Sequence, residues 1–240
     1  MKIVMIHGQN HHGSTWHVSH VLLEKMTCDK KVKEYYLPKD LNHFCCGCYG
    51  CIKQRENCPF WKEKSVMMQD ILEADLLIMT SPNYCMMPSA PLKAFFDLFF
   101  TNWMIHRPYQ EMFDKKAIVI STSAGASPKK TTKAIAYTLS HWGIPYIIQY
   151  GKAIQAMNWE GVSLKTKEKI EKDMTLIATR LLKKQKPHVG IKTKGYFYFA
   201  KMLQKQNWGS SQEEYQYWKD QGWLDHQRPW EKNNERNKKM

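Results

Sequence analysis

The sequence predicts a doubly wound α/β fold, in which helices cover both faces of a parallel sheet. Two observations point to it. Five short segments are rich in Val, Ile, Leu and Met, and a segment with helical periodicity follows each of them. The chain of 240 residues is long enough for one large domain or two small ones, with a core that needs no cross-links.

The predicted strands are short apolar segments that end in small or polar residues. They cover residues 2–8, 32–38, 75–82, 116–123 and, with a weaker pattern, 145–151. Apolar residues on both faces are typical of strands in the centre of a parallel sheet, covered on both sides. Right-handed crossovers bring the carboxyl ends of such strands to one edge, where ligands bind.

The predicted helices follow the strands in order. They cover residues 15–26, 64–74, 90–103, 129–143 and 166–185. In the first, Val18, Val21 and Leu22 recur at helical spacing, and Ser14 is expected to cap its start. Gly143 is expected to end the fourth, because glycine adopts the left-handed conformation that often closes a helix.

The residues after Pro187 have a different composition. They are aromatic and basic and show no strand pattern, and residues 195–206 are expected to form one more helix. So many Trp and Tyr side chains rarely stay in water. We therefore expect a domain of residues 1–186 and an extension of residues 187–240 that packs on this domain or on a second subunit.

The chain is basic, with 36 Lys and Arg against 22 Asp and Glu and a formal charge of +14. This excess favours anionic partners such as a phosphorylated cofactor, nucleic acid or an acidic surface. Nucleic acid is disfavoured, because the lysines are scattered over predicted helices without a recognised reader motif. No apolar run approaches the ~20 residues of a membrane span, and the apolar start is too short for a secretory signal. We expect a cytoplasmic protein with no membrane partner.

The first predicted strand ends in the sequence HGQNHHGSTW, residues 7–16. Two glycines followed by Ser14 and Thr15 offer backbone N–H groups, small hydroxyls and the positive end of a helix dipole, which together suit a phosphate. The loop lacks the spacing of the Walker and dinucleotide motifs, and a plain capped turn is the alternative. His11 and His12 could add positive charge or bind a metal.

Two further strand ends carry loops that suit a ligand. Pro82 ends the third strand, so the backbone of Asn83 and Tyr84 is expected to offer N–H and C=O groups to a flat ring. A long loop with a core tyrosine is the alternative. The fourth strand ends in STSAGAS, residues 121–127, which lets a ligand approach the backbone closely. Three such loops on one edge predict a phosphorylated planar cofactor across the crevice.

The combined pattern resembles the flavodoxin-like NAD(P)H-dependent FMN reductases, and within them the branch that includes iron–sulfur flavoproteins. It comprises the first loop, a Cys-x-Gly-Cys-x-x-Cys loop after the second strand, SPNY followed by LKAFFD after the third, and the small-residue fourth loop. The likeness covers residues 1 to about 185. It implies a flavodoxin-like sheet of strand order 2-1-3-4-5, bound FMN, NAD(P)H as reductant and a homodimer.

By position, the resemblance also implies which residues hold the cofactor. Those implied for the FMN phosphate are Gln9, Asn10, Gly13, Ser14 and Thr15. For the flavin ring system of FMN, the resemblance implies Pro82, Asn83 and Tyr84 on one side and Ser121, Thr122 and Gly125 on the other. Asn10 stands where the family often has a basic residue, so phosphate binding would rely on backbone amides, assisted by His11 or His12.

Five of the seven cysteines lie within residues 45–59. Cys45, Cys48 and Cys51 are spaced two apart and Cys58 follows after six residues, which is similar to the ligand run of a [4Fe–4S] cluster in bacterial ferredoxins. Structural zinc usually needs two separated pairs. Reduced thiols that pack the loop are the remaining interpretation, because free cysteine behaves as a small apolar residue.

The predicted function is an FMN-dependent oxidoreductase. NAD(P)H delivers hydride to the flavin, which passes electrons to a small-molecule acceptor such as a quinone or flavin, or to a redox protein. The flavin carries the chemistry, so no catalytic residue is named, and no triad or carboxylate pair is recognisable. The alternative is an iron–sulfur flavoprotein that relays electrons with FMN and a [4Fe–4S] cluster. The sequence leaves the acceptor and the choice between NADH and NADPH open.

Overall fold

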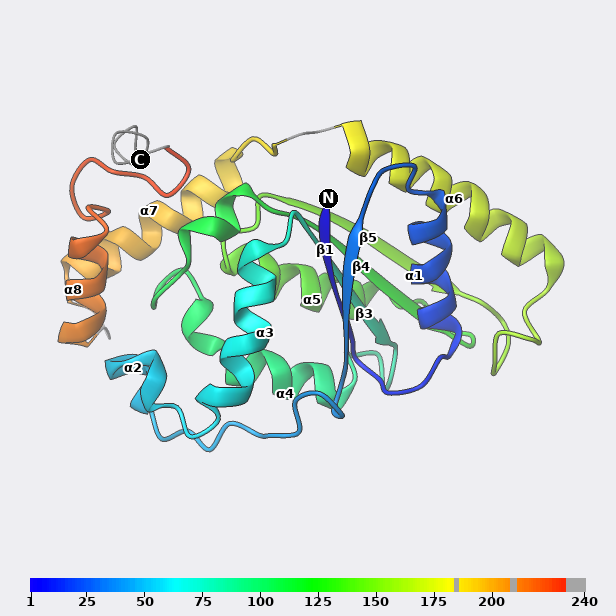
Figure 1. The fold of residues 1–240 in the computed structure, drawn as a ribbon, viewed down its shortest axis with the longest axis horizontal. Coiled ribbons are helices and arrows are strands. Elements are labelled where there is room, and N and C mark those ends of the chain that lie inside the picture. The colour runs from blue at the N-terminus through cyan, green and yellow to red at the C-terminus, as the bar shows by residue number, and fades with distance from the viewer. Residues whose placement is uncertain (184–185, 208–210, 232–240) are drawn as a thin grey trace.

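The predicted fold class is confirmed by the computed structural model, which describes residues 1–183, 186–207 and 211–231 (Figure 1). The described residues form a parallel sheet of five strands in the order β2-β1-β3-β4-β5. The strands are β1 (Lys2–His7), β2 (Lys31–Tyr36), β3 (Leu76–Pro82), β4 (Lys116–Ser123) and β5 (Tyr146–Ala153).

Helices cover both faces of the sheet. Figure 1 shows α1 and α6 on one face and α3, α4 and α5 on the other, with α7 and α8 beyond the second group. The α-helices are α1 (Ser14–Lys25), α2 (Gly50–Lys53), α3 (Trp61–Glu73), α4 (Ala90–Leu98), α5 (Lys129–His141), α6 (Leu164–Lys183), α7 (Ile191–Lys205) and α8 (Gln212–Asp220). Short 3-10 helices are η1 (Arg55–Asn57), η2 (Phe100–Asn102) and η3 (Gln110–Asp114).

Two apolar cores lie on opposite faces of the sheet. Successive side chains of a strand point to opposite faces. Ile3 and Met5 of β1 therefore belong to the core under α1 and α6, whereas Val4 and Ile6 belong to the core under α3, α4 and α5. This two-sided burial is the reason why the central strands read as continuous apolar runs.

The predicted strand order 2-1-3-4-5 is confirmed, so the apolar pattern indicates central strands correctly for β1, β3 and β4 and wrongly for the edge strands β2 and β5. In β2, the side chains of Lys31, Val32 and Lys33 are exposed. An edge strand pairs on one side only, and charged side chains there hinder pairing with other chains. β5 lies at the opposite edge and is also only partly buried.

The structure tests two of the predicted helix ends. α1 already begins at Ser14 and Gly13 takes the N-cap position, so the predicted capping role of Ser14 is wrong. The predicted stop at Gly143 is confirmed, because α5 ends at His141 and Gly143 has φ +101°. A Cβ at Gly143 would also come within 2.8 Å of the Phe113 ring.

The C-terminal helices pack on the domain through an aromatic cluster. Phe197, Trp218 and Trp223 are buried against Met104 and Phe113, which lie between α4 and β4. Residues 208–210 and 232–240 of the predicted extension, and 184–185 of the fifth predicted helix, lie outside the described residues. Within the part of the chain that is described, no helix combines the length and apolar content that crossing a membrane requires.

One helix was predicted in this region, and the structure contains a second, α8. It begins with a capping box, in which Ser211 accepts from the Glu214 backbone and the Glu214 side chain accepts from the Ser211 backbone. The sequence signal was the S-x-x-E spacing, which is typical of a helix start.

Candidate functional site

A cavity of about 540 Å³ opens at the carboxyl edge of the sheet. Its walls come from the β1–α1, β3–α4, β4–α5 and β5–α6 loops, and its volume lies within the ~300–1,000 Å³ of small-molecule sites. The predicted site residues that line it are Gln9, Gly13, Ser14, Thr15, Pro82, Asn83, Tyr84 and Thr122. Those that do not line it are Asn10, Ser121 and Gly125.

The β1–α1 loop sets the first turn of α1 against this cavity. No side chain caps the turn at Gly13, and the turn contains no acidic residue. Ser14 and Thr15 are buried and contribute hydroxyls to the wall, while His11 and His12 lie on the same loop and line the cavity. Uncapped N–H groups at a helix start carry partial positive charge. This wall therefore favours an anionic group.

The β3–α4 loop supplies side chains to the cavity, and its backbone N–H groups are used elsewhere. The N–H of Asn83 donates to the carbonyl of Thr122 (2.9 Å), and that of Tyr84 donates to the carbonyl of Met87 (3.1 Å). The prediction that these two N–H groups face a ligand is therefore wrong. The ladder between β3 and β4 continues one residue past Pro82, and the loop then closes into a tight turn.

Thr122 and Ser121 are neighbours in β4 and point to opposite faces of the sheet. Thr122 lines the cavity, and its Oγ1 lies 2.5 Å from Oγ1 of Thr15 in α1. Ser121 is buried away from it, and its hydroxyl has no hydrogen-bond partner among the described residues. Gly125 is exposed, with no atom within 4 Å of the position of a Cβ. Only Thr122 of these three reaches the site.

The β5–α6 loop forms a fourth wall that the sequence analysis missed. Its lining residues are Ile154, Ala156, Met157, Asn158, Trp159 and Glu160. Trp159 stacks on His17 of α1, with ring centroids 5.0 Å apart, and Met157 is 93% exposed. The fifth strand was expected to end at Gly151, whereas β5 runs to Ala153. The signal was available, because the loops after all parallel strands lie at one edge.

His7, the last residue of β1, also lines the cavity and was not predicted as a site residue. Its Nδ1 lies 3.0 Å from Oγ1 of Thr80, and its Nε2 lies 2.9 Å from the Glu34 carboxylate. The Tyr36 hydroxyl donates to the same carboxylate (2.8 Å), and His20 lies 3.4 Å from its other oxygen. Hydrogen bonds from His20 and His7 hold the pKa of Glu34 well below its usual range. An ionised Glu34 therefore fixes the ring of His7.

The cavity combines two kinds of wall. One is the uncapped helix start with the hydroxyls of Ser14 and Thr15, which suits a phosphate. The other is aromatic, with Tyr84 on one loop and Trp159 on another, and suits a flat ring. The residues present therefore fit a phosphorylated planar cofactor such as FMN.

The cysteine loop lies between β2 and α3, and none of its cysteines lines this cavity. The four predicted metal ligands share one small hollow, whose walls are Cys45, Cys46, Cys48, Tyr49, Cys51, Cys58, Pro59, Phe60, Leu98 and Phe100. The described cysteines are all free thiols. Among the described residues, no three His, Cys, Asp or Glu side chains are grouped so as to hold a metal ion. The fold gathers the thiols without setting them in ligand geometry.

A buried lysine lies beside these thiols. Lys64 is 3% exposed, and its Nζ lies 3.8 Å from Sγ of Cys58. Burial raises the pKa of Cys51, with Lys64 acting in the opposite direction. Hydrogen bonds from the backbone of α2 and from Cys46 lower the pKa of Cys48. Cys48 therefore has more thiolate character than an ordinary cysteine.

Comparison with known proteins agrees with this geometry. A model of the NADPH-dependent FMN reductase family matches residues 1–149, more than half of the chain. A search of curated proteins gave no match.

Several solved structures share the fold at low sequence identity. An azoreductase from Bacillus anthracis strain Sterne has a TM-score of 0.57 at 13% identity, over 75% of this chain and 99% of that chain. The apo form of the NADH:FMN oxidoreductase EMOB has a TM-score of 0.54 at 16% identity, over 78% and 92%. The NAD(P)H:acceptor oxidoreductase FerB from Paracoccus denitrificans has a TM-score of 0.54 at 17% identity, over 76% and 97%.

Proposed function

The chain belongs to the NADPH-dependent FMN reductase family and is an NAD(P)H-dependent FMN oxidoreductase, and we propose that the 540 Å³ cavity holds the flavin. Reduced flavin then passes electrons to a small-molecule acceptor such as a quinone or a free flavin. The observation that carries this proposal is the uncapped, acid-free start of α1, which forms one wall of a cavity whose other walls are aromatic.

In this proposal the first loop holds the phosphate. The N–H groups at the start of α1 and the hydroxyls of Ser14 and Thr15 bind its oxygens, with Gln9 alongside and Gly13 leaving room for the approach. The contact between Thr15 and Thr122 ties α1 to the end of β4, so that the hydroxyls stay in place when a ligand arrives. His11 and His12 line the same wall and offer ring N–H donors in place of the basic residue common in the family.

In this proposal the flavin ring system of FMN lies against the remaining walls of the cavity. Pro82, Asn83 and Tyr84 bound one side, and Trp159 bounds another. When bound, FMN accepts hydride from the nicotinamide and releases electrons to the acceptor, and the protein supplies orientation and excludes water. The side chain of Asn83 accepts a hydrogen bond from Thr131 (2.5 Å), which fixes the amide at the cavity wall.

We also propose a cytoplasmic homodimer. Exposed apolar side chains lie on two cavity loops: Tyr84 is 48% exposed, Met87 54% and Met157 93%. Large apolar groups around a site are typical of an interaction surface. A second subunit that covers them would also close the cavity to water. Size-exclusion chromatography with light scattering measures the assembly directly.

The decisive test is the identity of the bound cofactor. We expect acid extraction of the purified protein to release FMN, and NAD(P)H to bleach the flavin absorbance under anaerobic conditions. Protein that neither carries nor rebinds FMN would contradict the proposal. Steady-state assays with a quinone, free FMN and an azo dye, each with NADH and NADPH, then identify the acceptor and the preferred reductant.

A second candidate function is supported by the cysteine loop. Cys45, Cys48, Cys51 and Cys58 line one hollow, beside the buried side chain of Lys64. A [4Fe–4S] cluster held there would make the protein an electron carrier that passes single electrons to a redox partner. Its thiols do not have cluster geometry as they stand.

Anaerobic purification distinguishes the two candidates. A carrier would show a broad absorbance shoulder beside the flavin bands and contain iron and labile sulfide. Substitution of Cys51 by Ser would remove the iron and leave the flavin in place. Flavin absorbance without iron, in protein prepared anaerobically, would leave the reductase as the function and the cysteines as packing thiols.

A further inference from the structure

The helix α7 exposes large apolar side chains on its outer side. Helices on a protein surface normally turn polar side chains to water. The outer side of α7 instead carries four large apolar residues: Ile191 is 90% exposed, Phe199 58%, Tyr198 47% and Met202 41%. A residue this apolar is unremarkable when it stands alone, whereas four on one helix form a continuous surface.

The helical spacing places these four residues in one stripe. At 3.6 residues per turn they fall within about 100° of the helix circumference, over a length of about 16 Å. The opposite side of α7 is the one that packs on the protein, through Thr193, Phe197, Ala200 and Gln204. The apolar stripe therefore points directly away from the body of the protein. We call it the outer stripe of α7.

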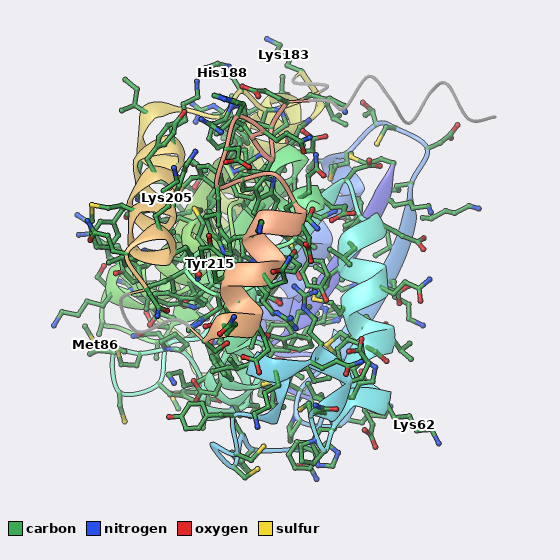
Figure 2. All side chains as sticks on the ribbon, turned by 90° about the vertical axis from the view of Figure 1, so that its left-hand side faces the viewer. Lys62, Met86, Lys183, His188, Lys205 and Tyr215 are labelled. Carbon is green, nitrogen blue, oxygen red and sulfur yellow. The ribbon has the colours of Figure 1, made fainter. Side chains whose placement is uncertain are left out.

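Positive charge borders the outer stripe on both sides. Lys194, Lys201 and Lys205 follow one border and Lys192 stands on the other, and α7 contains no acidic residue. Arg228 adds a further cation, because its Nε donates to the Tyr198 hydroxyl (3.2 Å). Figure 2 looks onto the C-terminal helices, where α7 runs along one side of the molecule beside α8 and carries the labelled Lys205.

We propose that the outer stripe of α7 binds the surface of a membrane that contains anionic lipids. Apolar side chains flanked by lysines are the pattern of helices that lie in the interface, with the rings and alkyl groups below the headgroups and the ammonium groups at phosphate level. This peripheral contact needs no membrane-spanning helix. It revises the sequence-based expectation of no membrane partner, which rested only on the absence of an apolar run of spanning length.

The charge pattern favours lipid over the other possible occupants. A second copy of this chain, paired through this stripe, would bring two sets of these lysines together in a two-fold interface. An acidic protein would satisfy the charge. It would also need a groove to receive a convex ridge, whereas a fluid interface adapts to the ridge.

Vesicle sedimentation tests the proposal on the full-length protein. We expect binding to vesicles of equal parts phosphatidylglycerol and phosphatidylcholine, and much weaker binding to phosphatidylcholine alone. Added salt should weaken the binding, because it screens the lysines. Equal binding to both vesicle types, or none to the anionic ones, would overturn the proposal.

Two variants separate the apolar and the electrostatic contributions. Replacing Ile191 and Phe199 together by Ser should lower the partition coefficient at least about tenfold at every salt concentration, since their burial in lipid is lost. Replacing Lys192 and Lys205 together by Gln should lower the partition coefficient roughly twenty-five-fold at low salt, at about fivefold per lysine, and much less at high salt. Unchanged binding in either variant would contradict the inference.

The matched control removes apolar residues from another helix. Leu164 and Leu176 on α6 are 78% and 61% exposed, and replacing both by Ser should leave vesicle binding unchanged. All variants should oxidise NAD(P)H at the parent rate, because α7 and these two leucines do not line the flavin cavity. If the substitutions at Ile191 and Phe199 altered the oligomeric state and left vesicle binding intact, a second copy would be the occupant and the proposal would fail.

Discussion

Two cavities of similar size lie at opposite edges of the sheet, and only one has the character of a ligand site. The cavity at the carboxyl edge measures about 540 Å³ and the one at the amino edge about 510 Å³. The first is lined by the start of α1, and the second by the ends of α3 and α6. Helix starts carry partial positive charge and helix ends partial negative charge.

At the amino-edge cavity, lysine side chains of the protein itself bind the carbonyl groups at the helix ends. Lys115 donates to the carbonyls of Leu72 (2.6 Å) and Ala74 (2.7 Å) at the end of α3, and Lys116 donates to the carbonyl of Leu181 (2.6 Å) in α6. The start of α1 has no such side-chain partner. The two cavities therefore differ in their polar groups rather than in their volume. A ligand site needs polar groups at its wall that the protein itself leaves unsatisfied.

The largest expected effect comes from placing a negative charge at the start of α1. Ser14→Glu should weaken FMN binding at least about a hundredfold, since two unit charges ~4 Å apart repel by ~4 kcal/mol at an effective dielectric constant of ~20. Ser14 is buried, so the larger charged side chain carries a desolvation cost that the helix dipole offsets only in part, and thermal unfolding of the apo variant measures the loss of stability. Fluorescence titration with FMN measures the affinity.

The matched control makes the same one-unit change of charge at the other cavity. The side chain of Lys186 lines the amino-edge cavity and is 61% exposed, and Lys186→Gln should leave FMN affinity within about twofold, because exposed charges more than ~10 Å apart are screened at ~0.1 M salt. Equal losses in the two variants would mean that total charge, rather than the helix start, attracts the phosphate.

The next effect sharpens the comparison at the amino edge. Burial lowers the pKa of Lys115 to about 8, against 10.5 for an unperturbed lysine. Between these values the unfolded chain holds a proton that the folded chain has lost, so stability rises with pH in that window. Lys115→Met should remove this rise. Between pH 8 and 10.5, the free energy of unfolding should therefore increase by about 3 kcal/mol less in the variant than in the parent protein.

Urea unfolding of parent and variant at several pH values between 7 and 10.5 measures this difference. An exposed lysine at the same cavity provides the control, and Lys186→Met should follow the parent curve. A parallel pH dependence of the parent and Lys115→Met would show that the ammonium group is better solvated than its burial indicates.

A smaller effect is expected from the wall that the sequence analysis missed. Trp159→Ala should weaken FMN binding about tenfold, because an aromatic ring against a flat ligand contributes roughly 0.5–1.5 kcal/mol beyond its burial. Trp159→Phe keeps a ring and should retain most of the affinity. If both variants bind FMN like the parent, the β5–α6 loop closes the cavity without touching the flavin.

The smallest effect concerns backbone strain in the β3–α4 loop, at the carboxyl edge. Met86 has φ +64°, where a side chain costs roughly 1–2 kcal/mol. Met86→Gly should therefore stabilise the protein by about 0.5 kcal/mol, after allowing for the greater freedom of glycine in the unfolded chain. Met87 has no positive φ, and Met87→Gly should destabilise it. Thermal unfolding measures both variants, and the melting temperature should rise in Met86→Gly and fall in Met87→Gly.

Sequence reasoning identified the correct loops more reliably than the correct atoms. It placed Ser14, Thr15, Tyr84 and Thr122 at one edge of the sheet, and the structure brings them to one cavity. It also assigned ligand roles to the N–H groups of Asn83 and Tyr84, which the protein uses itself. The orientation of a backbone N–H group or side chain within a loop depends on hydrogen-bond partners far away in the sequence. The local sequence pattern does not reveal these partners.

The sequence by itself determined the alternation of strands and helices, and hence the edge at which a ligand can bind, because hydrophobic periodicity is a local property. Only the tertiary structure decided that Thr122 faces the cavity while Ser121 does not, and that Glu34 meets His7. Each of these depends on strand pairing and side-chain packing between residues far apart in the chain, which form only once the sheet has assembled.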